Sequence, residues 1–190
     1  MKPFDRTLLE TSVRNILIAI GDNPDREGLK ETPARVASAY EEMFSSLHQK
    51  AFTESKVFNS SLANDGELVV VADIPFYSMC EHHLLPFFGS VSVGYMPKNG
   101  RIIGLSKIPR LVDYVAKKPN VQENLTSQIG LELQKLVDPQ GVAVVVKARH
   151  MCTEMRGIKK ANSHTLTSFF SGAFKNKDNR MEFLQEIKNQ

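Results

Sequence analysis

Apolar side chains recur every three or four positions in two stretches near the start of the chain, a spacing typical of amphipathic helices. The first stretch covers residues 5–20, with Asp5 as the expected N-cap and Gly21 as the expected end. The second has Thr32 as its expected N-cap, followed by a proline at the first helical position. Residues 48–66 are polar and show no period. The pattern therefore predicts a pair of helices followed by a linker.

From residue 67 onward the pattern changes to alternation and to β-branched runs, which are typical of strands. An Asn-Gly dipeptide between two of these runs favours a hairpin turn. Helices are predicted between the runs and at the end of the chain. The predicted strands are 68–74, 88–96, 101–105, 142–152 and 164–171, and the predicted helices are 106–117, 120–137 and one from Asp178. The fold class is therefore α+β, with two strand pairs flanking two helices and an N-terminal helical pair.

Composition limits the class of protein. A chain of 190 residues with 42% hydrophobic residues suits one packed domain with a helical annex, which we place at residues 61–190 and 1–60. No apolar run approaches the ~18 residues that span a membrane, and charges in the first twenty residues argue against a signal peptide. A cytoplasmic location is the default expectation. The net charge of +3 is too small to indicate a nucleic-acid partner.

Two short clusters hold both cysteines and three of the five histidines: Cys80-Glu81-His82-His83 and His150-Met151-Cys152. Two cysteines in a reducing compartment favour metal binding over a disulfide. Three thiolate or imidazole ligands would satisfy a catalytic zinc ion and leave its fourth position open for water. The C-x-x-H spacing lets Cys80 and His83 converge on one ion from a single tight turn. The clusters therefore predict a metal centre.

The strand predicted at 142–152 would place His150 and Cys152 on the same side, because alternate residues of a strand share a face. Cys152 would then bind the metal, with His150 beside it for proton transfer and His82 elsewhere in the same pocket. Two alternatives stay open. One is a closed structural zinc with His82 or His150 as the fourth ligand, and the other is two buried thiols with unrelated histidines.

Polar residues open two of the predicted helices, and each set has a structural and a ligand-binding interpretation. Ser106 and Lys107 open a helix with Arg110 one turn later, and a helix N-terminus with such residues suits an anion. These cations could equally be solvated. Gln122-Glu123 opens the next helix, where Glu123 fits a capping box with Asn120. Its carboxylate could instead be buried and accept paired hydrogen bonds from the N1–H and amino group of guanine.

Several motifs together resemble the GTP cyclohydrolase I family, in the right order along the chain. They are Glu31–Val36, residues 80–89, 104–110, 121–126, 150–157 and 165–168. The resemblance implies a tunnelling fold, in which subunits join edge strands into a barrel and pair as a homodecamer. It also implies the reaction in which GTP and water give 7,8-dihydroneopterin triphosphate and formate.

The resemblance implies roles for particular residues. Cys80, His83 and Cys152 fall on the zinc ligands, and His82 and His150 fall on proton-transfer histidines. Gln122 and Glu123 fall on a guanine-binding pair, and Ser106 is also expected to assist the later proton transfers. Four residues fall on triphosphate contacts, some of which reach across a subunit boundary: Ser106, Lys107, Arg110 and Arg156.

Two features depart from the family pattern. Glu154 places an acid near the expected triphosphate, and His164 matches no catalytic position, so it is interpreted as structural. Two other classes of protein share such a fold: nitrile reductases with a cysteine nucleophile and a nicotinamide cofactor, and non-catalytic zinc-stabilised binding modules. The placement of Cys80 and Cys152 in ligand motifs argues against the reductase.

Overall fold

The computed structural model describes residues 3–60 and 66–189, which form two compact units, Met1–Lys50 and Ala51–Gln190. The domain boundary expected after residue 60 adjoins positions 61–65, which lie outside the described residues, as does the last part of the expected linker. Among the helices of the described ranges, none is both long and apolar enough to cross a membrane.

The first unit is a pair of helices, as the hydrophobic period predicts. Helix α1 spans Arg6–Ala19 and α2 spans Thr32–Met43, followed by a short 3-10 helix, Ser45–His48. The N-cap prediction for α1 is confirmed, because the Asp5 carboxylate accepts a hydrogen bond from the backbone N–H of Leu8 at 2.9 Å. Thr32 is the first residue of α2, and the position before it provides the N-cap without a side-chain hydrogen bond.

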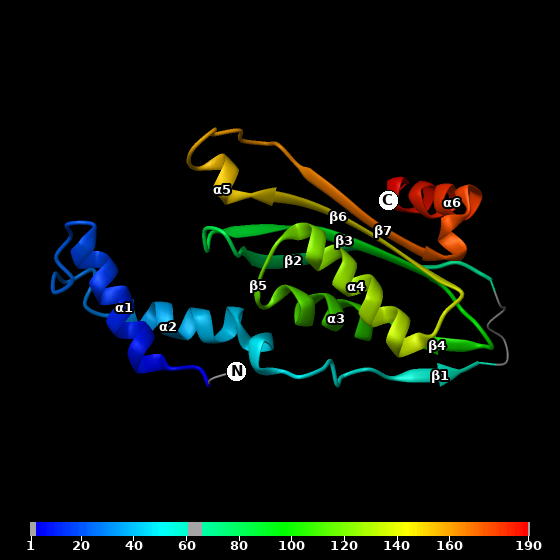
Figure 1. Ribbon diagram of the computed structural model, residues 1–190, viewed down its shortest axis with the longest axis horizontal. Coiled ribbons are helices and arrows are strands. Elements are labelled where there is room, and N and C mark those ends of the chain that lie inside the picture. The colour runs from blue at the N-terminus through cyan, green and yellow to red at the C-terminus, as the bar shows by residue number, and fades with distance from the viewer. Residues whose placement is uncertain (1–2, 61–65, 190) are drawn as a thin grey trace. The chain divides into compact units, whose positions relative to one another are not determined.

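The second unit is built on a five-stranded sheet (Figure 1). Neighbouring strands are antiparallel except for β5, which runs parallel to β2. In spatial order the strands are β5 (Pro119–Asn120), β2 (Val69–Cys80), β3 (Pro86–Met96), β6 (Gly141–His150) and β7 (Thr165–Gly172). The two long antiparallel pairs flank two helices in the sequence, so the predicted α+β class is confirmed.

A second, two-stranded sheet corrects one prediction. Strand β4 (Arg101–Ile103) was expected to return along the preceding strand after the Asn-Gly turn, but it pairs with β1 (Val57–Asn59) instead. Only a single bridge, Lys98 to Arg101, closes the turn itself. The polar segment before residue 60 looks aperiodic because this strand has only three residues.

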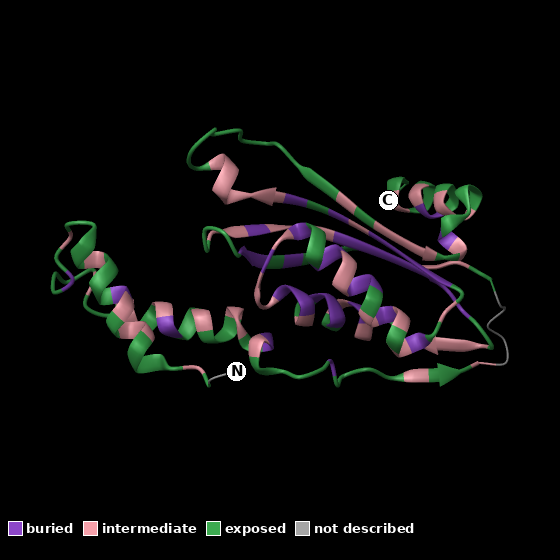
Figure 2. Ribbon diagram, viewed as in Figure 1, coloured by how far each residue is buried: buried purple, intermediate pink, exposed green. Residues whose placement is uncertain are grey.

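Helices cover both faces of the main sheet (Figure 1). Helices α3 (Lys107–Ala116) and α4 (Gln122–Val137) pack on one face, and α6 (Lys177–Lys188) packs on the other. Buried residues gather along β2, β3, β6 and the inner sides of α3 and α4 (Figure 2). Each large apolar side chain buried there contributes about 1.5–3 kcal/mol to folding. The core is therefore built mainly from apolar side chains.

Alternation along the strands decides which side chains face α3 and α4. On β6 every second residue from Val142 to Ala148 is buried in that core, so His150 lies on the same face at the end of the strand. Cys80 ends β2 in the same core. A Cβ at Gly89 would lie 1.9 Å from the carbonyl oxygen of Lys147, so only glycine allows β3 and β6 this approach. One end of the sheet thus brings Cys80 and His150 together.

Candidate metal centre and substrate site

A tight turn folds His83 back over Cys80. The carbonyl oxygen of Cys80 accepts hydrogen bonds from the N–H groups of His83 and Leu84, at 3.3 and 2.8 Å. Leu84 has a φ of 50°, in the left-handed region, and the chain then re-enters the sheet as β3. Nδ1 of His83 consequently lies 3.8 Å from Sγ of Cys80. The C-x-x-H spacing therefore brings the side chains of Cys80 and His83 together, as the sequence predicts.

Cys152 joins this pair, but from an element that the sequence did not predict. Strand β6 ends at His150, and Cys152 lies in a short helix, α5 (Met151–Glu154). The expectation that Cys152 shares a strand face with His150 is therefore wrong. The turn into α5 is tied by Thr153, whose hydroxyl donates to the carbonyl oxygen of His150 at 2.9 Å.

Even so, the ligand atoms of Cys80, His83 and Cys152 all lie within 4.8 Å of one another. Two sulfurs and one imidazole nitrogen form a donor set that suits zinc better than magnesium or calcium. Burial raises the pKa of the Cys152 thiol, and the neighbouring Cys80 raises it further. A cation would favour the thiolates against both effects. The three residues therefore fit a metal ion, and zinc in particular.

Arg156 and His82 border this cluster. A guanidinium nitrogen of Arg156 donates to Nε2 of His83 at 3.1 Å. A neutral imidazole has one lone pair, so His83 cannot accept this bond and bind a metal through Nδ1 at once. His82 is exposed, and its ring lies edge-on to that of His83 with centroids 6.3 Å apart. Both residues therefore lie at the open side of the cluster.

His150 is held by a buried polar network. Its Nε2 lies 2.7 Å from Oε1 of Gln122, and its ring stacks on Phe87 at 4.8 Å with an interplanar angle of 3°. Nε2 of Gln122 donates to the carbonyl oxygens of Val146 and Thr165, each at 3.1 Å, and to the hydroxyl of Thr167 at 3.0 Å. Gln122 is only 1% exposed. Its amide therefore belongs to the core of the protein.

Glu123 differs from its neighbour. It lies in the first turn of α4 and is exposed, so the expectation of a buried carboxylate is wrong for this chain. The N-cap of α4 is Val121 without a side-chain hydrogen bond, so the capping box expected with Asn120 does not form. The Glu123 carboxylate is thus available to a ligand. Burial lowers the pKa of His150, and the charge of Glu123 partly opposes this shift.

Three other predicted site residues, Ser106, Lys107 and Arg110, lie near the N-terminal end of α3. Ser106 and Lys107 stand at the N-terminal end of α3, whose last residue, Ala116, accepts a hydrogen bond from Ser78 near the metal cluster. Ten helical residues span about 15 Å, so the two ends of α3 are far apart. Arg110 forms an ion pair with Glu54. One chain therefore does not bring these three residues to the cluster.

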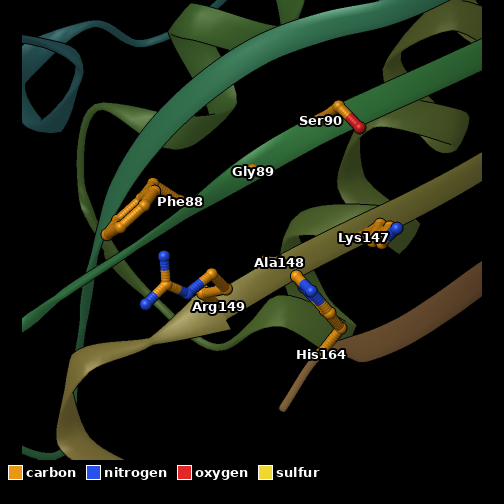
Figure 3. A pocket seen from close by; sticks show the side chains of 7 residues that line it. All are labelled: Phe88, Gly89, Ser90, Lys147, Ala148, Arg149 and His164. Carbon is orange, nitrogen blue, oxygen red and sulfur yellow. The ribbon is translucent and has the colours of Figure 1, made fainter. Parts of the chain in front are cut away.

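Sequence reasoning missed the partner of Glu154. Its carboxylate forms two hydrogen bonds with the Arg149 guanidinium, which hold the pKa of Glu154 below its usual range. Arg149 also borders a pocket on the sheet face away from α3 and α4, shown in Figure 3 with Phe88, Lys147 and His164 around it. The guanidinium lies 5.8 Å from the centre of the Phe88 ring. An acid and a base five residues apart form no recognisable sequence motif, so this ion pair could not be predicted.

The fold and the cluster define an α+β protein with a thiolate-rich candidate metal site at one end of its sheet. A family model described as GTP cyclohydrolase I matches residues 9–188, so the chain belongs to the GTP cyclohydrolase I family. The expected family is thereby confirmed.

Comparison with known proteins found, among others, two similar relatives and one similar solved structure. The chain is 57% identical over 183 residues to the bifunctional protein FolKE of Lactococcus lactis subsp. lactis (strain IL1403), covering 96% of this chain and 52% of that protein. It therefore spans about half the length of that relative. It is 57% identical over 181 residues to GTP cyclohydrolase 1 of Latilactobacillus sakei subsp. sakei (strain 23K), covering 95% and 96%. The crystal structure of the archaeosine synthase QueF-Like in the apo form covers 58% of this chain and 98% of its own, with a TM-score of 0.46 and 20% identity.

Proposed function

We propose that this chain converts GTP and water to 7,8-dihydroneopterin triphosphate and formate, the first step of folate and pterin synthesis. The observation that carries the proposal is the clustering of Cys80, His83 and Cys152 within 4.8 Å beside a held His150, in a chain of the GTP cyclohydrolase I family. A non-catalytic module would have no need of the histidine and the open carboxylate at this position.

Zinc is the proposed metal, held by Cys80, His83 and Cys152. Bound zinc would act as a Lewis acid and would lower the pKa of a coordinated water toward about 7. The residues around it then have separate tasks. His150 donates a proton to N7 in the imidazole ring of guanine, which makes C8 electrophilic. His82, exposed at the open side of the cluster, and Ser106 assist the later ring opening and closure.

Recognition of the base and of the triphosphate is divided between residues. The exposed Glu123 carboxylate accepts hydrogen bonds from the N1–H and amino group of guanine, a pair of donors that adenine lacks. The family assigns Gln122 to the same base. The triphosphate is bound by the hydroxyl of Ser106 and by three cationic side chains that can contact phosphate oxygens: Lys107, Arg110 and Arg156. Its binding energy positions the base for the reaction.

An oligomer completes this site. Arg156 lies at the metal cluster, whereas Lys107 stands at the first residue of α3, a helix about 15 Å long. We therefore assign Ser106, Lys107 and Arg110 to the site of a neighbouring subunit. Edge strands such as β7 would join subunits into a barrel, and two barrels would form the homodecamer. The same proposal places the enzyme in the cytoplasm, without nucleic-acid or membrane partners.

The test is formate release from GTP by metal-free and zinc-reloaded protein, with native mass measurement of the assembly. The expected result is turnover only after zinc is restored, in a decamer. A zinc-loaded decamer that binds GTP and releases no formate would favour the alternative of a binding module. Reduction of a nitrile with a nicotinamide cofactor would favour the reductase class.

A further inference from the structure

The hydrogen bonds of Gln122 fix which way its amide points. The atom placed as Nε2 lies within 3.1 Å of two backbone carbonyl oxygens, those of Val146 and Thr165, and both can only accept. If the amide were turned over, its oxygen would face these two oxygens, and three acceptors would lie together without a hydrogen between them. The nitrogen must therefore occupy this position, and Oε1 must face His150.

The amide orientation in turn fixes the tautomer of His150. Oε1 of Gln122 is an acceptor, and Nε2 of His150 lies 2.7 Å from it, so this ring nitrogen must carry a hydrogen. Stacking of the ring on Phe87 at 4.8 Å prevents the ring from turning over freely. Within the described residues, the structure records no hydrogen bond to Nδ1 of His150. Nδ1 is therefore the one ring nitrogen open to a ligand.

We propose that Gln122 is a positioning residue that acts through His150, and that His150 exchanges its proton with the substrate through Nδ1. This inference rests on the proposed function and deepens it. In the acid step the Nδ1–H bond breaks, its proton passes to a ring nitrogen of the base, and the electron pair stays on Nδ1. The Nε2–H bond to Gln122 remains intact throughout.

The inference assigns Gln122 a different task from the base contact that the family resemblance implies. The Gln122 amide has two hydrogens, and three protein acceptors already lie within 3.1 Å of its nitrogen. The side chain is almost fully buried behind His150. Glu123, the next residue, is exposed and can serve the base alone. Gln122 thus positions His150, and Glu123 recognises the base.

The decisive measurement is the nitrogen NMR spectrum of zinc-loaded protein labelled with ¹⁵N-histidine, without substrate, at a pH where His150 is neutral. The His150 signals are identified by their loss in His150→Ala. We expect a pyrrole-type shift at Nε2 and a pyridine-type shift at Nδ1. The opposite pattern in the wild-type protein would overturn the proposal. This spectrum decides the question even if no variant of Gln122 folds.

Two variants link the tautomer to catalysis. Gln122→Met keeps the volume but removes the acceptor, so the His150 tautomers should mix. We expect kcat to fall on the order of ten- to a hundredfold, with KM changed less than about threefold and zinc content unchanged. Thr167→Val removes one partner of the same amide but leaves Oε1 in place, so tautomer and kcat should persist. A rise of KM at constant kcat in Gln122→Met would identify a substrate contact and refute the positioning role.

The outcomes also separate this inference from the proposed function. If the wild-type protein released no formate from GTP, the proposed function would fail, and the nitrogen spectrum would still report whether Gln122 fixes the His150 tautomer. If formate were released and His150 carried its hydrogen on Nδ1, the function would stand and the inference would fall.

Discussion

The guanidinium of Arg149 and the carboxylate of Glu154 form two parallel hydrogen bonds, at 2.9 and 2.5 Å. Arg149 is the penultimate residue of β6 and Glu154 is the last residue of α5, so the pair bridges the junction that carries His150 and Cys152. The carboxylate side chain is only 6% exposed. The acid that seemed misplaced beside a triphosphate is therefore neutralised by a cation of its own.

We expect Glu154→Gln to lower the midpoint of urea unfolding and to weaken zinc binding about tenfold, because the bidentate pair holds the helix of Cys152. Zinc affinity is measured by competition with a chelator. Glu27→Gln is the matched control, since Glu27 is 93% exposed and its ion pair with Lys30 is solvated. Equal behaviour of the two variants would mean that the Arg149 pair does not support the metal site.

The neighbours His150 and Cys152 should separate chemistry from metal binding. Cys152→Ala is expected to lose the zinc, because a site of two remaining ligands binds weakly. His150→Ala is expected to retain zinc and GTP, and to release formate about 10²–10⁴-fold more slowly, the usual contribution of a proton-transfer residue. Elemental analysis and formate assays measure the two effects. Loss of zinc from His150→Ala would instead make His150 a ligand of a closed site.

Glu123→Ala should weaken GTP binding by about 1–3 kcal/mol, because two donors of guanine lose their acceptor. Since Glu123 is exposed and caps nothing, the thermal midpoint should change little. Calorimetric titration with GTP and thermal unfolding measure the two quantities. If both Glu123→Ala and Glu123→Gln lost stability and binding to the same degree, the carboxylate would serve the helix alone.

Arg156→Ala should weaken binding of GTP far more than binding of guanosine, and the wild-type preference for GTP should decline as salt is added. Zinc content should change little, because Arg156 contacts Nε2 of His83 and is not itself one of the three ligand residues. Lys135→Ala, an exposed cation on α4, is the control for loss of one positive charge. Equal competition by guanosine and GTP for the wild-type site would show that no residue here binds phosphate.

Removal of the metal should abolish turnover and leave the fold largely intact. The core between the sheet and α3 and α4 is closed by apolar side chains, with Cys80 only at its margin. Circular dichroism before and after mild chelation measures the fold, and a formate assay measures the activity. Global unfolding on chelation would indicate a structural metal site.

The sequence predicted those parts of the site that depend on local geometry. Cys80 and His83 share one turn, so their spacing alone indicated convergence. Cys152 was chosen correctly for the cluster, but from a strand that the structure ends two residues earlier, because the chain turns into α5. The Gln122 network was not predictable, since its partners come from β6 and β7 and depend on how these strands pair.

The two ends of the metal cluster are about 70 residues apart, and the chain between them contains β3, α3, α4 and β6. Protein synthesis proceeds at about 5–20 residues per second, so Cys152 is synthesised several seconds after Cys80 and His83. The three candidate ligands can therefore come together only after β6 and α5 have been synthesised.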